Sequence, residues 1–245
     1  MPGHGPKVLI PVLLLCGACS DASPGGLPPG QRLLTGRIVV TDSGTSGTSA
    51  AQVAALFAFP GGACPPGSLR VGNAAPDVAS CAIFGEPFAA DGSAPFRLLL
   101  PCDRTVNLIV QRLGDSGGQS PGDPLAVLAF PTGAGAADET TTLLAREPGC
   151  RATAELATVI LDLGDVTVSA LASADGTPRP VVVGGPGGGQ NPLATVDTDG
   201  DFSANLADAD DDDDGTPDAS DDDRDGDGLA DGAQAFSPAW LASGT

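Results

Sequence analysis

The residues best suited to chemistry are aspartates near the C-terminus. Asp197, Asp210 and Asp223 lie 13 residues apart, and each opens a D-x-D-x-D pattern. Carboxylates at the first, third and fifth positions converge when the backbone curls around a hard cation, and Ca²⁺ takes about six to eight oxygen ligands. Glycine at the sixth position suits the sharp turn, because glycine tolerates positive φ. The pattern therefore predicts three successive calcium-binding loops over 197–234.

Acidic side chains at positions 1, 3, 5, 9 and 12 of these loops are the predicted calcium ligands. They are Asp197, Asp199, Asp201 and Asp208 in the first loop, Asp210, Asp212, Asp214, Asp218 and Asp221 in the second, and Asp223, Asp225, Asp227 and Asp231 in the third. Phe202 replaces the turn glycine of the first loop, and Gln234 replaces the last carboxylate of the third. The middle loop has every ligand, so we expect it to bind calcium most tightly.

The middle loop resembles a thrombospondin type 3 repeat, because it matches the pattern D-x-D-x-D-G-x-x-D-x-x-D at every specified position. The third loop follows the same pattern from Asp223 to Asp231. The resemblance implies an irregular array organised by Ca²⁺. An EF-hand fits less well, because position 12 is never Glu and the spacing leaves no room for flanking helices. The alternative is a solvated acidic tail, but three loops in register favour calcium binding.

Charge and missing residue types exclude several function classes. Residues 197–231 hold 16 Asp against one Arg, a net charge of −15. This segment would repel nucleic acid, because binding a phosphate backbone needs cations. The chain has no Tyr, and its single His and single Lys are His4 and Lys7, in a segment that we expect to be removed. The commonest general bases and Schiff-base nucleophiles are then absent, so we predict that the protein is not an enzyme.

The N-terminus has the pattern of an export signal. One cation precedes the apolar run VLIPVLLLCGAC, which is too short to span a bilayer as a helix. The residues LCGACS resemble a bacterial lipobox, which implies lipidation of Cys19 and attachment to the membrane. We therefore predict a signal peptide (1–18), a Pro- and Gly-rich tether (19–35) and a cell-envelope location as an outer-membrane lipoprotein. The alternative is an ordinary signal peptide cleaved nearby.

Short apolar runs separated by turn residues indicate β structure in the middle of the chain. Partial alternation of apolar and polar residues favours half-buried strands. The candidate strands are 37–41, 53–59, 96–100, 106–111, 126–130, 140–144, 158–163 and 165–170, and a helical turn is the alternative for 51–56. We predict a mainly β fold, with a small antiparallel β-sandwich over 36–172, a Gly- and Pro-rich linker (173–196), the aspartate array and a C-terminal tail (235–245).

The order of three segments, GRIVV, VAALFAF and FRLLLPCDRTVNLIVQ, resembles the transthyretin-like domains of carboxypeptidase regulatory type. The resemblance implies a structural or interaction module.

The cysteines fit an exported protein. Removing the signal peptide and assigning Cys19 to lipid leaves Cys64, Cys81, Cys102 and Cys150. An even number in an oxidising compartment favours two disulfides, and three pairings are open. We favour Cys64–Cys81, which closes a loop rich in turn residues, and this choice leaves Cys102–Cys150.

Together these features predict a calcium-binding, membrane-anchored surface or periplasmic lipoprotein with a structural or adhesion-related role. Its expected partners are calcium ions, the membrane, and an extracellular protein or glycan that the sequence does not identify. The alternative is a carbohydrate- or peptide-binding β-sandwich with a calcium-stiffened tail.

Overall fold

The computed structural model describes residues 30–41, 50–89, 93–113, 124–132, 140–147, 160–169, 178–183, 191–238 and 240. The predicted signal peptide, Cys19 and Cys150 lie outside the described residues. None of the helices within these ranges has the length and hydropathy to span a bilayer.

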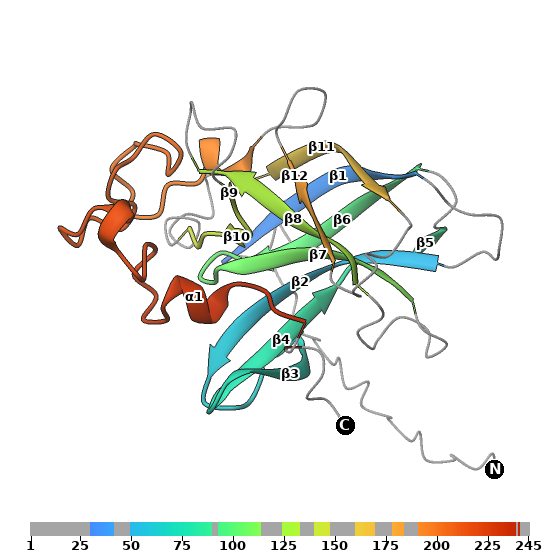
Figure 1. Ribbon diagram of the computed structural model, residues 1–245, viewed down its shortest axis with the longest axis horizontal. Helices are drawn as coiled ribbons and strands as arrows, with labels where there is room; N and C mark the ends of the chain where they lie inside the picture. The colour runs from blue at the N-terminus through green and yellow to red at the C-terminus, as the bar shows by residue number, and fades with distance from the viewer. Residues whose placement is uncertain are drawn as a thin grey trace, which may run out of the picture.

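The fold is a mainly β sandwich of two sheets (Figure 1). The smaller sheet has the order β11-β1-β6, and the larger has the order β12-β8-β7-β2-β4-β3, with β5, β9 and β10 paired at its margins. The strands are β1 Gln31–Thr41, β2 Ala50–Pro60, β3 Leu69–Ala75, β4 Val78–Phe84, β5 Phe88–Ala89, β6 Ser93–Pro101, β7 Val106–Arg112, β8 Pro124–Pro131, β9 Thr140–Thr141, β10 Leu143–Leu144, β11 Ile160–Ser169 and β12 Arg179–Val182. The predicted mainly β fold is confirmed.

Alternate residues of the two sheets form the main core. The small sheet contributes side chains such as Leu34, Phe96 and Leu163, and the large sheet contributes residues such as Phe57 and Leu108. Successive side chains on a strand point to opposite faces, so each strand places every second residue between the sheets. β6 shows this most clearly, because its buried and exposed residues alternate from Phe96 onward.

The large sheet is also covered on its other face. β2 is buried on both sides, and its second set of side chains, Ala54, Leu56 and Ala58, belongs to a separate apolar cluster. Phe236 and Trp240 from the C-terminal segment join this cluster, with their ring centroids 6.5 Å apart. The short helix α1, Asp231–Gln234, lies beside β2 (Figure 1). Phe236 and Trp240, in the segment predicted as a tail, therefore pack on the sandwich.

Several strand predictions need correction in detail. Within the described residues, the predicted strands 158–163 and 165–170 form one strand, β11, which runs through Gly164 with φ 61. Residues 51–56 lie in β2 and form no helical turn. β3, β4, β5 and β12 were not expected, and β12 lies inside the predicted linker (173–196). The missed hairpin β3–β4 turns through Pro76 and Asp77, and its strands are rich in Ala, Gly and Ser, which give weak strand signals.

Two strand pairings are parallel, within a sandwich that we expected to be antiparallel. β1 pairs with β11, and β8 pairs with β12, in parallel. Both pairs join strands that are distant in the chain, and such separation provides the long crossover connection that parallel strands need. Apolar alternation carries no information about strand direction, so the sequence pattern could not show this.

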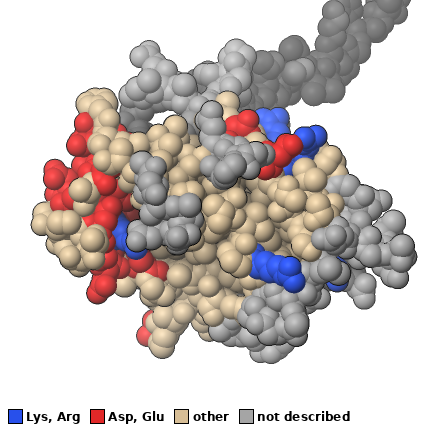
Figure 2. Space-filling model, turned by 45° about the horizontal axis from the view of Figure 1, so that its top comes forward, with Lys and Arg blue, Asp and Glu red and all other residues tan. Residues whose placement is uncertain are grey.

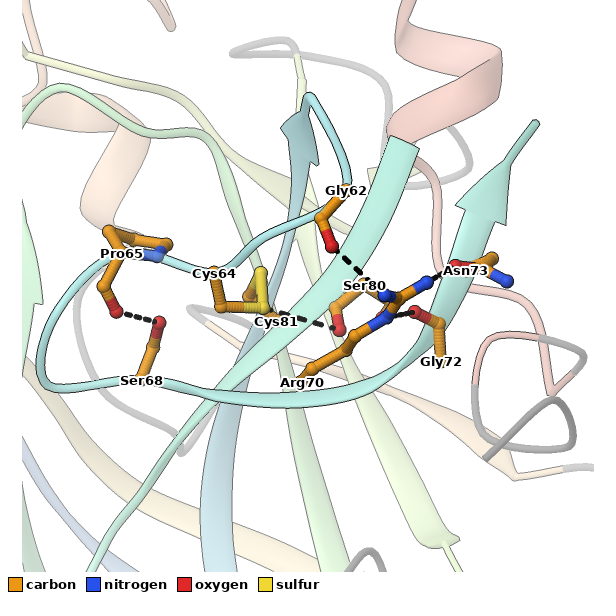
Figure 3. Close-up of a disulfide and its surroundings, with 9 residues drawn as sticks. All are labelled: Gly62, Cys64, Pro65, Ser68, Arg70, Gly72, Asn73, Ser80 and Cys81. Carbon is orange, nitrogen blue, oxygen red and sulfur yellow. Dashed lines mark hydrogen bonds between the residues drawn. A yellow bond between two sulfur atoms is a disulfide. The ribbon is translucent and has the colours of Figure 1, made fainter. Parts of the chain in front are cut away.

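The predicted disulfide Cys64–Cys81 is present, with the two Cα atoms 5.6 Å apart (Figure 3). It ties the segment before β3 to β4. Arg70 supports the same region by donating hydrogen bonds to the carbonyl of Gly62 at 2.9 Å and to the side chain of Asn73. Cys102 is also disulfide-bonded.

Asn107 on β7 attaches the C-terminal segment to the sandwich. It is 1% exposed, donates to the backbone carbonyl of Gln234 at 2.6 Å and accepts from the backbone N–H of Phe236 at 3.0 Å. We predict that Asn107→Ala destabilises the protein by about 2–3 kcal/mol, because it leaves buried backbone groups unpaired. The emission of Trp240, the sole tryptophan, should shift to the red as this segment loosens.

Asn73→Ala is the comparison for this substitution, because Asn73 lies exposed on β3 and its hydrogen bond from Arg70 is an exposed one, away from the C-terminal segment. Thermal unfolding and fluorescence compare the two variants. Equal stability losses would contradict the proposed attachment.

Candidate metal centre

The structure brings together the first, third and fifth residues of each predicted loop. Within each triplet, one carboxylate oxygen from each residue lies within 4.8 Å of the others. The triplets are Asp197, Asp199 and Asp201; Asp210, Asp212 and Asp214; and Asp223, Asp225 and Asp227. These three carboxylate clusters could each hold a metal ion. They line one side of the molecule, where Asp and Glu gather (Figure 2).

The same backbone turn builds all three clusters. Positions 4 and 6 of every loop have positive φ: Gly200 (86°) and Phe202 (77°), Asp213 (54°) and Gly215 (93°), and Gly226 (57°) and Gly228 (87°). Phe202 thus adopts the turn in the absence of glycine. A left-handed conformation at a residue other than glycine costs about 1–3 kcal/mol. The first loop therefore keeps the geometry of the other two at an energetic cost.

Backbone N–H groups orient the carboxylates toward the centre of each loop. The N–H of position 6 donates to Oδ2 of position 1 at 3.1, 3.0 and 2.9 Å in the three loops in turn. The N–H of position 7 donates to Oδ1 of position 5 at 2.6, 2.7 and 2.9 Å. These bonds hold the carboxylates close together despite their charge.

Residues at position 9 brace the loops and lie outside the triplets. Oδ1 of Asn205 and Oδ1 of Asp218 each accept from the backbone N–H of position 2 of their own loop, both at 3.0 Å. Asp231 forms an ion pair with Arg224 at 3.1 Å. The predicted ligands Asp218 and Asp231 therefore have local structural contacts instead of a place in a cluster.

The predicted position 12 ligands also lie outside the triplets. Oδ1 of Asp208 accepts from the backbone N–H of Asp210 at 3.2 Å, and Oδ1 of Asp221 accepts from that of Asp223 at 2.8 Å. Each therefore holds the start of the following loop. Gln234 donates from Nε2 to Oδ1 of Asp227 at 2.9 Å, so it positions a predicted ligand.

The third loop is bound directly to the sandwich. Asp225 is 3% exposed, and its Oδ2 accepts from the hydroxyl of Thr105 and, at 3.5 Å, from the backbone N–H of Arg146. The Arg146 guanidinium donates to the backbone carbonyls of Asp225 and Gly226, the latter at 2.8 Å. The backbone carbonyl of Arg146 accepts from the hydroxyl of Thr198 in the first loop at 3.1 Å. Arg146 therefore joins two loops to the sandwich.

Sequence reasoning missed Thr105, Asn107 and Arg146. None belongs to the aspartate motif, and each meets the array across a long stretch of chain. Their residue types gave no signal, because Thr, Asn and Arg are ordinary residues at strand ends.

Two triplet residues have a carboxylate oxygen that suits a bound cation. Oδ1 of Asp210 and Oδ1 of Asp225 are buried, and neither has a hydrogen-bond partner among the described residues. Burying a charged group without a partner is costly. A cation in each cluster would supply the missing interaction, so the donor set fits a metal ion.

Crowding and burial raise several carboxyl pKa values in the array. Burial, followed by the neighbouring charge of Asp225, raises the pKa of Asp227 to about 6. Burial also raises the pKa of Asp212, with repulsion from Asp214, Asp221 and Asp210 adding to it. Asp221 is therefore close enough to the second triplet to add to its negative charge.

Asp211, which lies beside the second triplet, is affected most strongly. Burial and then Asp218 raise its pKa to about 7. The metal-free array thus contains more negative charge than its surroundings compensate.

Gly226, at position 4 of the third loop, packs against the second loop, and a side chain there would overlap the carboxylate of Asp212. We predict that Gly226→Ala lowers stability and calcium affinity, because it displaces Asp212 and also strains a left-handed residue. The matched control is Gly200→Ala, at the same loop position, where a Cβ would meet nothing within 4 Å. That control should lose only about 1–2 kcal/mol from backbone strain. Thermal unfolding and calcium titration measure both, and equal losses would contradict close packing of the two loops.

The raised pKa values also predict a pH dependence. In the folded protein the pKa is about 7 for Asp211 and about 6 for Asp227 and Asp231, above the ordinary value of 3.8. These groups therefore hold their protons more tightly in the folded protein than in the unfolded chain. Their contribution to stability is therefore complete below pH 3.8 and is lost as the pH rises through 6 and 7.

Metal-free protein should lose stability over this range. Calcium-saturated protein should gain it, because metal binding requires ionised carboxylates. Unfolding midpoints measured against pH in chelator and in saturating calcium test this, and a flat profile in chelator would contradict it.

Comparison with known proteins adds no family assignment: no family model, curated protein or solved structure matches this sequence.

Proposed function

We propose that the protein binds calcium in its three aspartate loops and that the bound calcium secures the array to the β-sandwich. The buried Oδ1 of Asp225, which has no hydrogen-bond partner among the described residues, carries this proposal. Asp225 belongs to a triplet of converging carboxylates, and its other oxygen is held by Thr105. A cation at this triplet would contact both the loop and the residue that fixes the loop to the sandwich.

The ligand chemistry supports calcium over other metals. The clusters consist entirely of carboxylates, without the His or Cys ligands that zinc and copper favour. Three carboxylates per cluster on a curled backbone suit the flexible oxygen coordination of Ca²⁺. Mg²⁺ demands near-ideal octahedral geometry and releases its water reluctantly, so it should compete poorly.

The role that follows is structural. The array contacts the sandwich through Arg146 and Thr105, and the following segment covers the outer face of the large sheet. Calcium would therefore stabilise the whole folded unit, and its effect would extend beyond an isolated acidic tail. We propose this structural role in place of a catalytic one.

The cellular context proposed for this role is the cell envelope. The disulfide Cys64–Cys81 and the bonded state of Cys102 are consistent with an oxidising compartment. Lipidation of Cys19 and a surface or adhesion-related task remain proposals that rest on the sequence pattern alone.

Calcium titration of the full chain after signal removal tests the proposal. We expect binding with Kd on the order of 10⁻⁴–10⁻³ M, as in extracellular calcium modules, and a rise in the unfolding midpoint of the whole protein. Asp212→Asn should weaken binding by about tenfold or more, because it removes one charged ligand.

Asp213→Asn is the control for Asp212→Asn: it removes a charge from the same loop, but Asp213 is exposed and outside the triplet. Asn tolerates the left-handed backbone found there, so this variant should bind calcium nearly as well as the parent. An unfolding midpoint that is identical in calcium and in chelator would refute the structural role.

A further inference from the structure

Arg32, the second residue of β1, places a positive charge inside the sandwich. Its side chain is 0% exposed, and Leu34, two residues further along the same face of the strand, belongs to the main core. A charge is costly to bury unless opposite charge or hydrogen bonds compensate it. The contacts of the Arg32 guanidinium should therefore show what holds this charge in the interior.

Hydrogen bonds of the guanidinium account for little of this compensation. Nη2 donates to the carbonyl oxygen of Arg104 at 3.4 Å and to that of Leu144 at 3.5 Å. Both bonds are longer than the ~2.7–3.2 Å usual for an N–H donor and a carbonyl oxygen. Nε and Nη1 have no hydrogen-bond partner among the described residues. Nearby negative charge is therefore the main compensation for this buried cation.

The two carbonyl contacts place the guanidinium beside the residues that hold Asp225. Arg104 is followed by Thr105, whose hydroxyl donates to Oδ2 of Asp225. Leu144 lies two residues before Arg146, whose backbone N–H donates to the same oxygen at 3.5 Å. Both of the chain segments that fix the third loop to the sandwich therefore also contact the buried guanidinium.

Two carboxylates compensate the charge of Arg32. Burial lowers the pKa of Arg32 to about 10, while attraction to Glu147 and then to Asp225 acts to raise it. Glu147 belongs to none of the triplets, and its backbone N–H donates to the carbonyl of Cys102 at 2.7 Å. Asp225 belongs to the third triplet. One of the two counter-charges of Arg32 is therefore also a predicted calcium ligand.

Calcium in the third loop would change the charge near Arg32. The three ionised carboxylates of the triplet, Asp223, Asp225 and Asp227, carry a charge of −3, which one Ca²⁺ would reduce to −1. Interactions between charges are stronger in the protein interior than in water. The attraction between Arg32 and the third loop is therefore larger in the metal-free protein than in the calcium-bound protein.

We propose that Arg32 is an internal counter-cation of the third loop. It keeps the loop docked on the sandwich when calcium is absent, and its charge opposes calcium binding at the same triplet. This inference rests on the proposed calcium function and adds the residue that limits the calcium affinity of the loop. Arg32 thereby makes the docked array less dependent on calcium.

Unfolding midpoints of the full chain after signal removal, measured in chelator and in saturating calcium, test the proposal. Arg32→Met removes the charge and should lower the midpoint in chelator, because Glu147 and Asp225 lose a counter-charge. Calcium should restore much of this loss. The calcium-induced rise in the midpoint should therefore be larger in Arg32→Met than in the parent protein, by about 2–4 °C or more.

Three further variants separate a charge effect from damage to the core. Arg32→Lys supplies a positive charge and should show a calcium-induced rise closer to that of the parent than to that of Arg32→Met. Leu34→Ala, on the same face of β1, should lower the midpoint equally in chelator and in calcium. Arg32→Met in a Glu147→Gln background should keep its larger calcium-induced rise, because Asp225 is still present. If Arg32→Met does not fold in either condition, Arg32→Gln, which is neutral but keeps N–H donors, takes its place.

Two results would overturn the proposal. One is a calcium-induced rise in Arg32→Met that equals or falls below that of the parent. The other is loss of the difference in the Glu147→Gln background, which would assign Arg32 to Glu147 alone. If the parent itself shows no calcium-induced rise, the proposed calcium function fails and this inference fails with it, so the parent protein distinguishes the two failures.

Discussion

The buried carboxylate of Asp225 is the contact on which the arrangement of array and sandwich depends. A carboxylate that is 3% exposed requires hydrogen bonds and nearby positive charge. Thr105 and Arg146 provide both on the side of the sandwich. Its other oxygen, Oδ1, has no hydrogen-bond partner among the described residues, and a cation at the third triplet would complete its environment. Metal binding and docking of the array are thus parts of one electrostatic arrangement.

A buried arginine in the core extends this arrangement into the sandwich. Arg32 on β1 is fully buried and donates to the carbonyl of Leu144 at 3.5 Å. Burial lowers its pKa to about 10, while Glu147 and Asp225 act to raise it. The negative charge of Asp225 therefore also affects the pKa of a residue in the smaller sheet. Removing the charge of Asp225 would therefore change the electrostatic environment of Arg32 in the core.

The C-terminal segment completes the structure through apolar contact. Leu229, Phe236 and Trp240 pack against the outer face of the large sheet, where Leu56 and Ile109 are buried. Calcium would therefore act at one end of a segment whose other end is held by the hydrophobic effect.

Local sequence patterns determined much of what was found. The triplets could be predicted because a calcium loop is built from a few consecutive residues whose own N–H groups orient the carboxylates. The main strands could be predicted from apolar alternation, and Cys64–Cys81 could be predicted from the turn-rich loop that it closes. The weak strands β3 and β4 could not, because Ala, Gly and Ser form strands there only through the pairing of β4 with β2, the pairing of β3 with β4, and the disulfide.

Tertiary structure alone decided how these parts meet. Thr105 and Asp225 are 120 residues apart in the chain, and Asn107 and Gln234 are 127 apart, so no local pattern could link them. Separation along the chain also hid the contacts of Arg32 with Arg104 and Leu144. A motif specifies which atoms could bind a cation, whereas the packing of distant segments determines which of those atoms remain free to do so.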